Sequence, residues 1–124
     1  SYGIPVKVDS DKEFCVQRHI AILKASKEMD IDYLYHILSS GFVFKQATDV
    51  ATGTAQKTVP LGGLREICIP LPSENEQLEI ARIIENKLSA LGRLNNEIEI
   101  QLQKAQRNKQ SILATAFKGR LNFE

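Results

Sequence analysis

A short loop of small and hydrogen-bonding residues, 51–57, carries the side chains best suited to recognition chemistry. Its polar members and its glycine are Thr52, Gly53, Thr54, Gln56 and Lys57. Hydroxyl and amide groups can hydrogen-bond a phosphate or a base, a lysine can neutralise a phosphate, and a glycine lets a backbone approach closely. We therefore take these five residues as a candidate contact for a phosphate or a base. The alternative is a turn that only connects two elements.

The other reactive side chains do not form a catalytic or metal-binding pattern. The two cysteines and two histidines lack the spacing of zinc ligands, so no metal site is expected: Cys15, His19, His36 and Cys68. The aspartate pairs in residues 9–11 and 30–32 fall at an expected turn and an expected helix start, which favours structural roles. The sequence has no phosphate-binding glycine loop and no nucleophile elbow. We expect a protein that is not an enzyme.

Charge and apolar content limit the remaining classes of protein to which the chain can belong. The 124 residues include 16 basic and 15 acidic side chains, a net charge of +1, so no basic tail can supply DNA affinity. The sequence lacks a run long and apolar enough to span a membrane and lacks a signal-peptide layout, which predicts a cytoplasmic protein. Cys15 and Cys68 lie in apolar runs and are expected to be buried free thiols. A disulfide between them is the alternative.

The last third of the chain, from Ser73 to about Phe117, is expected to form one long helix. Ser73 and Glu76 have the spacing of a capping box, in which each side chain satisfies a backbone N–H of the other. Gly119 is the expected C-cap. We accordingly divide the chain into a domain of residues 1–72 and a helical part of residues 73–124.

This helix carries a seven-residue repeat that is typical of a coiled coil. The repeat positions, separated alternately by three and four residues, lie along one side of the helix, which we call the seam. Its members are Ala81, Ile84, Leu88, Leu91, Asn95, Ile98, Leu102, Ala105, Lys109, Ile112 and Ala116. No other segment is long enough to cover this seam, so its partner must be another copy of the chain or part of a longer protein. The polar members, Asn95 and Lys109, are expected to fix register and orientation, unless the seam is loose enough to hydrate them.

Residues 1–72 are expected to form a small α+β domain of short strands and helices. Asp30 can cap a helix over residues 31–40, with Gly41 as a left-handed stop, and a second helix is expected over 42–50. Residues 61–64, which include two glycines, are expected to turn. Apolar alternation and β-branched residues predict strands over residues 3–8, 14–23, 57–59 and 65–71.

Three segments in this order closely resemble the specificity subunit of type I restriction-modification enzymes. The first is the loop TGTAQ, residues 52–56. The second is the junction IPLPSENEQ, residues 69–77. The third is the terminal run LQKAQRNKQSILATAFKGRL, residues 102–121. The matching segments extend from Phe14 to Leu121.

The resemblance implies a function that composition and spacing do not provide. Such subunits recognise a bipartite double-stranded DNA target with two recognition domains, joined by two helices that pack as an antiparallel pair. They dock methyltransferase subunits, which bind S-adenosylmethionine, and they meet the restriction subunit indirectly. This chain then corresponds to a partial recognition domain with one long coiled-coil helix, expected to form an antiparallel homodimer. The alternative is a structural dimerisation module without useful DNA binding.

Overall fold

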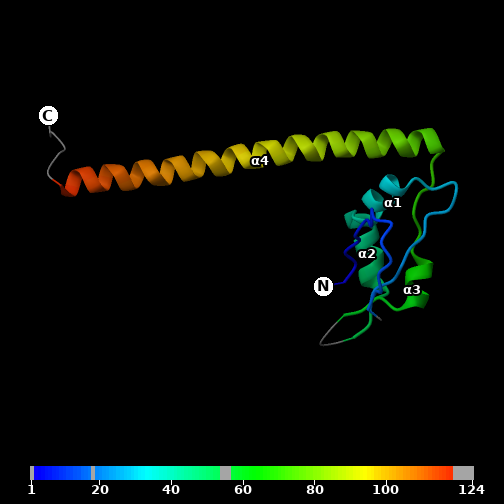
Figure 1. The fold of residues 1–124 in the computed structure, drawn as a ribbon. Helices are drawn as coiled ribbons and strands as arrows, with labels where there is room; N and C mark the ends of the chain where they lie inside the picture. Colours follow the sequence, from blue (N-terminus) through cyan, green and yellow to red (C-terminus); the bar gives the residue numbers. More distant parts are fainter. Residues whose placement is uncertain (1, 18, 54–56, 119–124) are drawn as a thin grey trace. The chain divides into compact units, whose positions relative to one another are not determined.

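In a computed structural model the described part of the chain is helical (Figure 1). The structure describes residues 2–17, 19–53 and 57–118. Its helices follow in the order α1 (Ile31–Leu38), α2 (Gly41–Asp49), α3 (Leu61–Glu66) and α4 (Glu74–Phe117). The chain forms two compact units, residues 1–84 and 85–124, so that the division falls inside α4.

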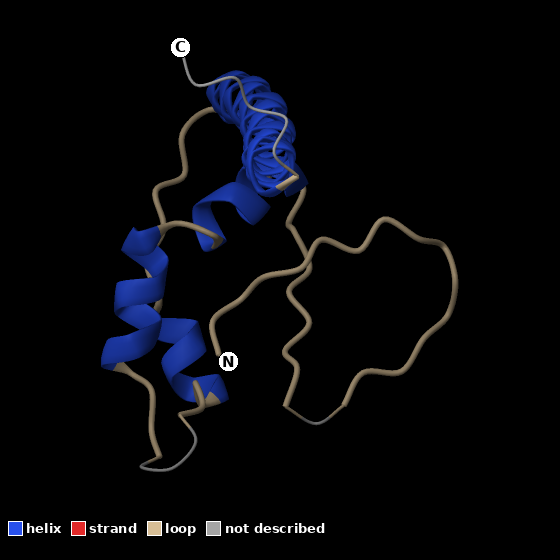
Figure 2. Ribbon diagram, turned by 90° about the vertical axis from the view of Figure 1, so that its left-hand side faces the viewer, coloured by secondary structure: helices blue, strands red, loops and turns tan. Residues whose placement is uncertain are grey.

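The predicted α+β fold is wrong, because the described residues form no sheet (Figure 2). Their β pairing consists of one isolated antiparallel bridge between Thr52 and Thr58. In the parts that the structure describes, the strands predicted over residues 3–8, 14–23, 57–59 and 65–71 do not form. Alternating apolar residues create a strand only when a neighbouring strand pairs their N–H and C=O groups, and these segments have no such neighbour among the described residues.

Glutamine side chains take over part of this pairing. Gln46 of α2 donates from Nε2 to the Cys68 carbonyl at 2.9 Å, and its Oε1 accepts from the Cys68 N–H at 3.0 Å. One amide thus satisfies both backbone groups of an extended residue, as a neighbouring strand would. The segment after α3 is held in this way without a sheet.

The two short helices α1 and α2 form where the sequence predicts them, but the boundary between them differs. Ser39 is the C-cap of α1, and Ser40 caps α2 by accepting from the Val43 N–H at 3.3 Å. Gly41 is therefore the first residue of α2 and not a left-handed stop, and its φ is not positive. The serine cap outweighs the glycine signal because it satisfies a free N–H at the helix start.

Residues 61–66 were predicted to turn and then enter a strand, and instead they form α3. Pro60 is the N-cap of this helix and provides no side-chain capping hydrogen bond. Gly63 is required by packing, since an added Cβ would lie 2.8 Å from the Cβ of Val50. Gly63 therefore permits α3 to approach the C-cap of α2 closely, whereas Gly62 faces open space.

The core of the described residues is small. Its buried apolar side chains are Tyr33, Val43, Ala47 and Ala81. The N-terminal segment adds to it by stacking Tyr2 on Phe44 with ring centroids 5.6 Å apart. Gly3, at φ 69°, passes so close to Phe44 that an added Cβ would lie 3.3 Å from its ring.

Both cysteines are exposed and neither forms a disulfide, so the predicted burial of Cys15 and Cys68 is wrong. The prediction relied on strands that would have covered these runs. Without a sheet, the apolar neighbours of Cys15 are exposed as well, including Phe14 and Val16.

The long helix is confirmed as α4, which begins one residue after Ser73 and ends at Phe117. Half of the predicted capping box forms. One carboxylate oxygen of Glu76 accepts from the Ser73 N–H at 3.0 Å, and the Ser73 hydroxyl donates to the same oxygen at 2.7 Å instead of capping an N–H. The hydroxyl contact, followed by the N–H contact, lowers the pKa of Glu76. The predicted C-cap, Gly119, lies outside the described residues.

Across the described ranges, no helix has the length and apolarity needed to cross a bilayer.

Candidate nucleic-acid interface and helix surface

The loop proposed to contact DNA is closed by backbone pairing. The Thr52 N–H donates to the Thr58 carbonyl and the Thr58 N–H donates to the Thr52 carbonyl, both at 2.9 Å. Gly53 follows the first of these residues with φ 104°, a conformation that favours glycine. The bridge thus brings the two ends of the predicted contact, Thr52 and Lys57, close together.

The described members of this loop are accessible. Thr52, Gly53 and Lys57 are exposed, whereas Thr54 and Gln56 lie outside the described residues. An exposed lysine next to the backbone bridge between Thr52 and Thr58 can reach a phosphate, and a threonine hydroxyl can add a hydrogen bond. The arrangement suits positioning on a phosphate backbone.

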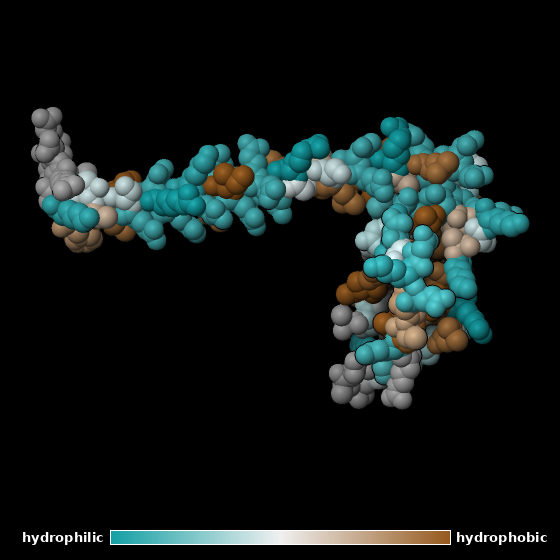
Figure 3. Space-filling model, in the orientation of Figure 1, coloured by the Kyte–Doolittle hydropathy of each residue, from teal (hydrophilic) through white to brown (hydrophobic). Residues whose placement is uncertain are grey.

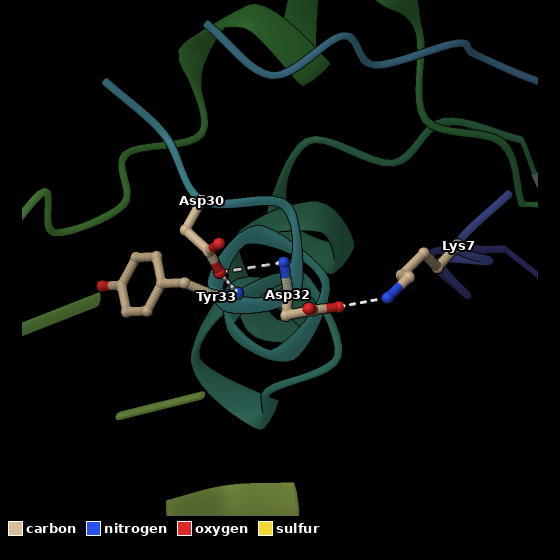
Figure 4. A network of polar contacts seen from close by, with 4 residues as sticks. All are labelled: Lys7, Asp30, Asp32 and Tyr33. Carbon is tan, nitrogen blue, oxygen red and sulfur yellow. Dashed lines mark hydrogen bonds and ion pairs between the residues drawn. The ribbon is translucent and has the colours of Figure 1, made fainter. Parts of the chain in front are cut away.

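The start of α1 is held by a separate polar network (Figure 4). The Oδ1 of Asp30 accepts from the backbone N–H groups of Asp32 and Tyr33 at 3.0 and 2.8 Å, which confirms the predicted N-cap. Asp32 also pairs with Lys7 from the N-terminal segment. Both aspartates therefore have structural partners, as expected for cap positions.

Gln77, one turn into α4, is the most buried polar side chain among the described residues, at 1% exposure. Its Oε1 accepts from the Asp30 N–H, and its Nε2 donates to the carbonyls of Glu28 and Pro72, all at 2.9 Å. We call this set of three hydrogen bonds the Gln77 clamp. It joins the residues before α1, the segment before α4 and α4 itself.

A second contact supports the same segment. The buried Tyr33 donates from its hydroxyl to the Pro70 carbonyl at 2.9 Å. Residues 70–72 are thus held by α1 through Tyr33 and by α4 through Gln77. Sequence reasoning missed Gln77, although one signal was available. It continues the heptad one step upstream of Ala81, so a polar residue occupies a position where burial is expected.

The predicted seam divides into two environments. Ala81 is 5% exposed and Ile84 is half-buried. The large apolar members beyond them are exposed in the single chain, at 54–61%, and comprise Leu88, Leu91, Ile98, Leu102 and Ile112. Asn95, Ala105 and Lys109 are exposed too, while Ala116 is half-buried. Figure 3 shows apolar side chains recurring between polar ones along this helix.

No group of three metal-ligating side chains lies close enough to hold an ion within the part of the chain that the structure describes. The polar clusters found there consist instead of caps, ion pairs and amide clamps.

Comparison with known proteins places these features in a family. Residues 5–104 match the family described as the type I restriction modification DNA specificity domain, and the chain belongs to this family. The match includes the loop, the Gln77 clamp and most of the exposed seam.

A curated relative agrees with this assignment. Over 118 residues, 94% of this chain, the sequence is 30% identical to the type I restriction enzyme EcoBI specificity subunit of Escherichia coli. The chain spans about a quarter of that protein's length, since the alignment covers 25% of it. No solved structure matches.

Proposed function

We propose that this chain recognises DNA as part of a type I restriction-modification complex. The observation that carries the proposal is the family match over residues 5–104, supported by similarity to a specificity subunit across nearly the whole chain. The chain contributes recognition and assembly in this proposal, and chemistry is left to its partner subunits.

The loop closed by the Thr52–Thr58 bridge is the proposed contact with the phosphate backbone. Its exposed lysine and hydroxyl, together with the positive φ of Gly53, support this assignment. Phosphate contacts fix register on a duplex without reading its sequence. We therefore assign Lys57 to positioning and not to base selection.

The exposed seam of α4 is the proposed site of helix pairing, with a second copy of the chain running antiparallel. From Ala81 to Ile112 the steps of three and four residues read the same in both directions. Two antiparallel copies can therefore align the ten positions from Ala81 to Ile112 about a midpoint between Asn95 and Ile98. Leu88 then lies opposite Ala105 of the second copy, so that a large side chain meets a small one.

A parallel pair is less favourable at Lys109. Each seam residue would then face its own counterpart, and two ammonium groups would meet in a desolvated interface. Asn95 would favour the parallel pair, because two amides at one level can hydrogen-bond each other. The ammonium repulsion is the larger effect, since a charge is costlier to bury than an amide.

The same assembly would present the methyltransferase subunits to a bipartite site in double-stranded DNA. S-adenosylmethionine would be bound by those subunits, and the restriction subunit would join through them. This part of the proposal is supported by the family assignment and by the similarity to a specificity subunit.

An electrophoretic shift assay with added methyltransferase subunits tests this proposal. A pool of random duplexes is incubated with the chain, the subunits or both, and bound DNA is sequenced. We expect recovery of a bipartite motif only when both proteins are present. Recovery of no motif, with a stable protein complex formed, would contradict DNA recognition.

A structural dimerisation module is the second candidate. It is favoured by the net charge of +1, because nonspecific DNA affinity comes mainly from phosphate neutralisation. In that case the chain would dimerise at tens of micromolar by light scattering and would add nothing to DNA binding by the methyltransferase subunits.

A further inference from the structure

The Gln77 clamp makes contacts that neither the heptad nor the recognition loop explains. Gln77 is an amide buried to 1% exposure at a heptad position that usually carries an apolar residue. Its Oε1 accepts one hydrogen bond and its Nε2 donates two, all at 2.9 Å, so both polar atoms of the side chain have partners. An apolar residue would fill this place without the strict geometry that three hydrogen bonds impose.

The partners of the clamp come from two separate stretches of backbone, residues 28–30 and Pro72. The Asp30 N–H belongs to the N-cap of α1, the Glu28 carbonyl precedes it, and the Pro72 carbonyl ends the segment before α4. The same Asp30 caps α1 through its side chain. A rotation of the first turn of α4 against α1 would therefore break several hydrogen bonds together.

The length of α4 makes such a rotation costly for recognition. A helix of 44 residues spans about 65 Å. A tilt of about 5° at its first turn would move its far end by about 5–6 Å, which exceeds the rise of about 3.4 Å between successive base pairs.

From this we infer that Gln77 is a positioning residue that fixes the first turns of α4 to the start of α1 and thereby sets the half-site spacing that the complex accepts. The inference about spacing rests on the proposed function, whereas the inference about the clamp does not. In this proposal Gln77 contacts neither DNA nor the seam. It acts by fixing the direction in which α4 leaves the start of α1.

Gln46 provides a matched control. It is also a glutamine whose amide holds an extended segment, at 2.9 and 3.0 Å, but its partner is Cys68 and not α4. Gln46→Leu should weaken the fold without loosening the start of α4. Gln77→Leu should do both.

The test uses pulsed electron paramagnetic resonance on the full chain. Nitroxide labels are attached at Ser39→Cys and Ile83→Cys, two exposed positions on either side of the clamp, after Cys15 and Cys68 are replaced by serine. We expect the distribution of label distances to broaden in Gln77→Leu and to keep its wild-type width in Gln46→Leu. Distance distributions of equal width in all three proteins, or equally broadened in both variants, would contradict the proposed role of the Gln77 clamp.

Gln77→Glu keeps the test decisive if Gln77→Leu does not fold. The carboxylate retains the acceptor for Asp30 but faces the Glu28 and Pro72 carbonyls without a proton. Burial raises the pKa of such a group, so mild acid returns one donor. We expect the label distances to narrow in Gln77→Glu between about pH 7 and about pH 5, while those of the wild type stay constant. No narrowing would contradict the hydrogen-bond geometry.

A spacing series then tests the role in recognition. Duplexes that differ by single base pairs between the half-sites are bound by the complex with its methyltransferase subunits. We expect the wild type and Gln46→Leu to lose about tenfold in affinity per added base pair, or about 1.4 kcal/mol, and Gln77→Leu to lose clearly less. Equal discrimination by Gln77→Leu would overturn the spacing role. Failure of the wild type to bind any duplex would refute the proposed function. The label distances would still test whether Gln77 fixes the start of α4 to α1.

Discussion

The first turns of α4 and its remaining turns carry the same heptad repeat in opposite environments. In residues 74–84 the repeat positions are occupied by Gln77, Ala81 and Ile84, which are buried or half-buried within their own unit. In residues 85–118 the large apolar repeat positions are exposed. One periodicity therefore occurs in two environments, since the first part completes a small domain and the second part leaves an apolar stripe exposed. The polar Gln77 occurs in the first part because neighbouring backbone can satisfy it.

Truncation of the exposed seam should give the largest effect and should act on association. We expect Leu88→Ala, Leu91→Ala or Ile98→Ala to weaken the dimer by about 2–5 kcal/mol, because each removes apolar atoms from a proposed interface. Glu97→Ala and Glu99→Ala, on exposed positions of the same helix, should cost a few tenths of a kcal/mol. Sedimentation equilibrium measures the dissociation constants. Similar losses in both groups would contradict the heptad assignment.

Loss of the α1 cap should give a smaller effect and should act on the fold. We expect Asp30→Ala to lower the free energy of unfolding by about 1 kcal/mol, because two N–H groups lose their acceptor. Asp32→Ala, which removes only a partly exposed ion pair with Lys7, should cost less. Urea denaturation compares the two variants. If Asp30→Ala changed the free energy of dimer dissociation more than the free energy of unfolding, the division between the two parts of α4 would be wrong.

Lys57→Ala should produce a modest effect limited to DNA binding. In the complex with methyltransferase subunits, one lost phosphate contact should reduce the slope of log affinity against log salt by about 0.9. Lys27→Ala, an exposed lysine outside the loop, provides the control. Fluorescence anisotropy at several salt concentrations measures both slopes. An unchanged slope in Lys57→Ala would remove the loop from the DNA interface.

The smallest expected effect is the pH dependence at the start of α4. The Ser73 hydroxyl and N–H hold the pKa of Glu76 below its ordinary value of 4.5, so the folded state favours the carboxylate. The resulting stabilisation is complete above pH 4.5 and is lost as the pH falls through the lowered pKa. Glu79 adds a change of the same sign, because its hydrogen bonds to Arg82 also lower its pKa.

Thermal melting from about pH 6 to about pH 2 measures this dependence in Glu76→Gln and in the wild type. The variant should lose part of the acid destabilisation and keep the part due to Glu79. A steeper loss in Glu76→Gln would reverse the sign and contradict the cap geometry.

Sequence reasoning succeeded where the determinants are local. Asp30 and Ser73 mark helix starts because their side chains or close neighbours satisfy nearby N–H groups, and the long repeat predicts α4 almost to the residue. It failed for the strands, since a strand depends on a partner strand whose residues are often distant in sequence or belong to another chain. It failed for Gly63 as well, because the requirement comes from contact with Val50 and not from local turn chemistry.

The candidate site could be predicted only in part for the same reason. The loop residues were proposed from their types and stay a prediction, whereas the bridge between Thr52 and Thr58 that closes the loop was not predicted. Gln77 was not predicted, because its partners, Glu28 and Asp30, are almost fifty positions away, with separations of 49 and 47 residues.

Disulfide trapping across the seam tests the central claim most directly. One batch of chain carries Leu88→Cys and another carries Ala105→Cys, both with Cys15 and Cys68 replaced by serine. In an antiparallel pair the two positions lie opposite each other, whereas the Leu88 positions of the two copies are about 25 Å apart, too far for a disulfide that needs Cα atoms within about 7 Å. We predict rapid oxidation of the mixed batches to a heterodimer and none of Leu88→Cys alone. Rapid crosslinking of Leu88→Cys with itself, and no Leu88–Ala105 heterodimer in the mixture, would show a parallel pair and contradict the antiparallel arrangement.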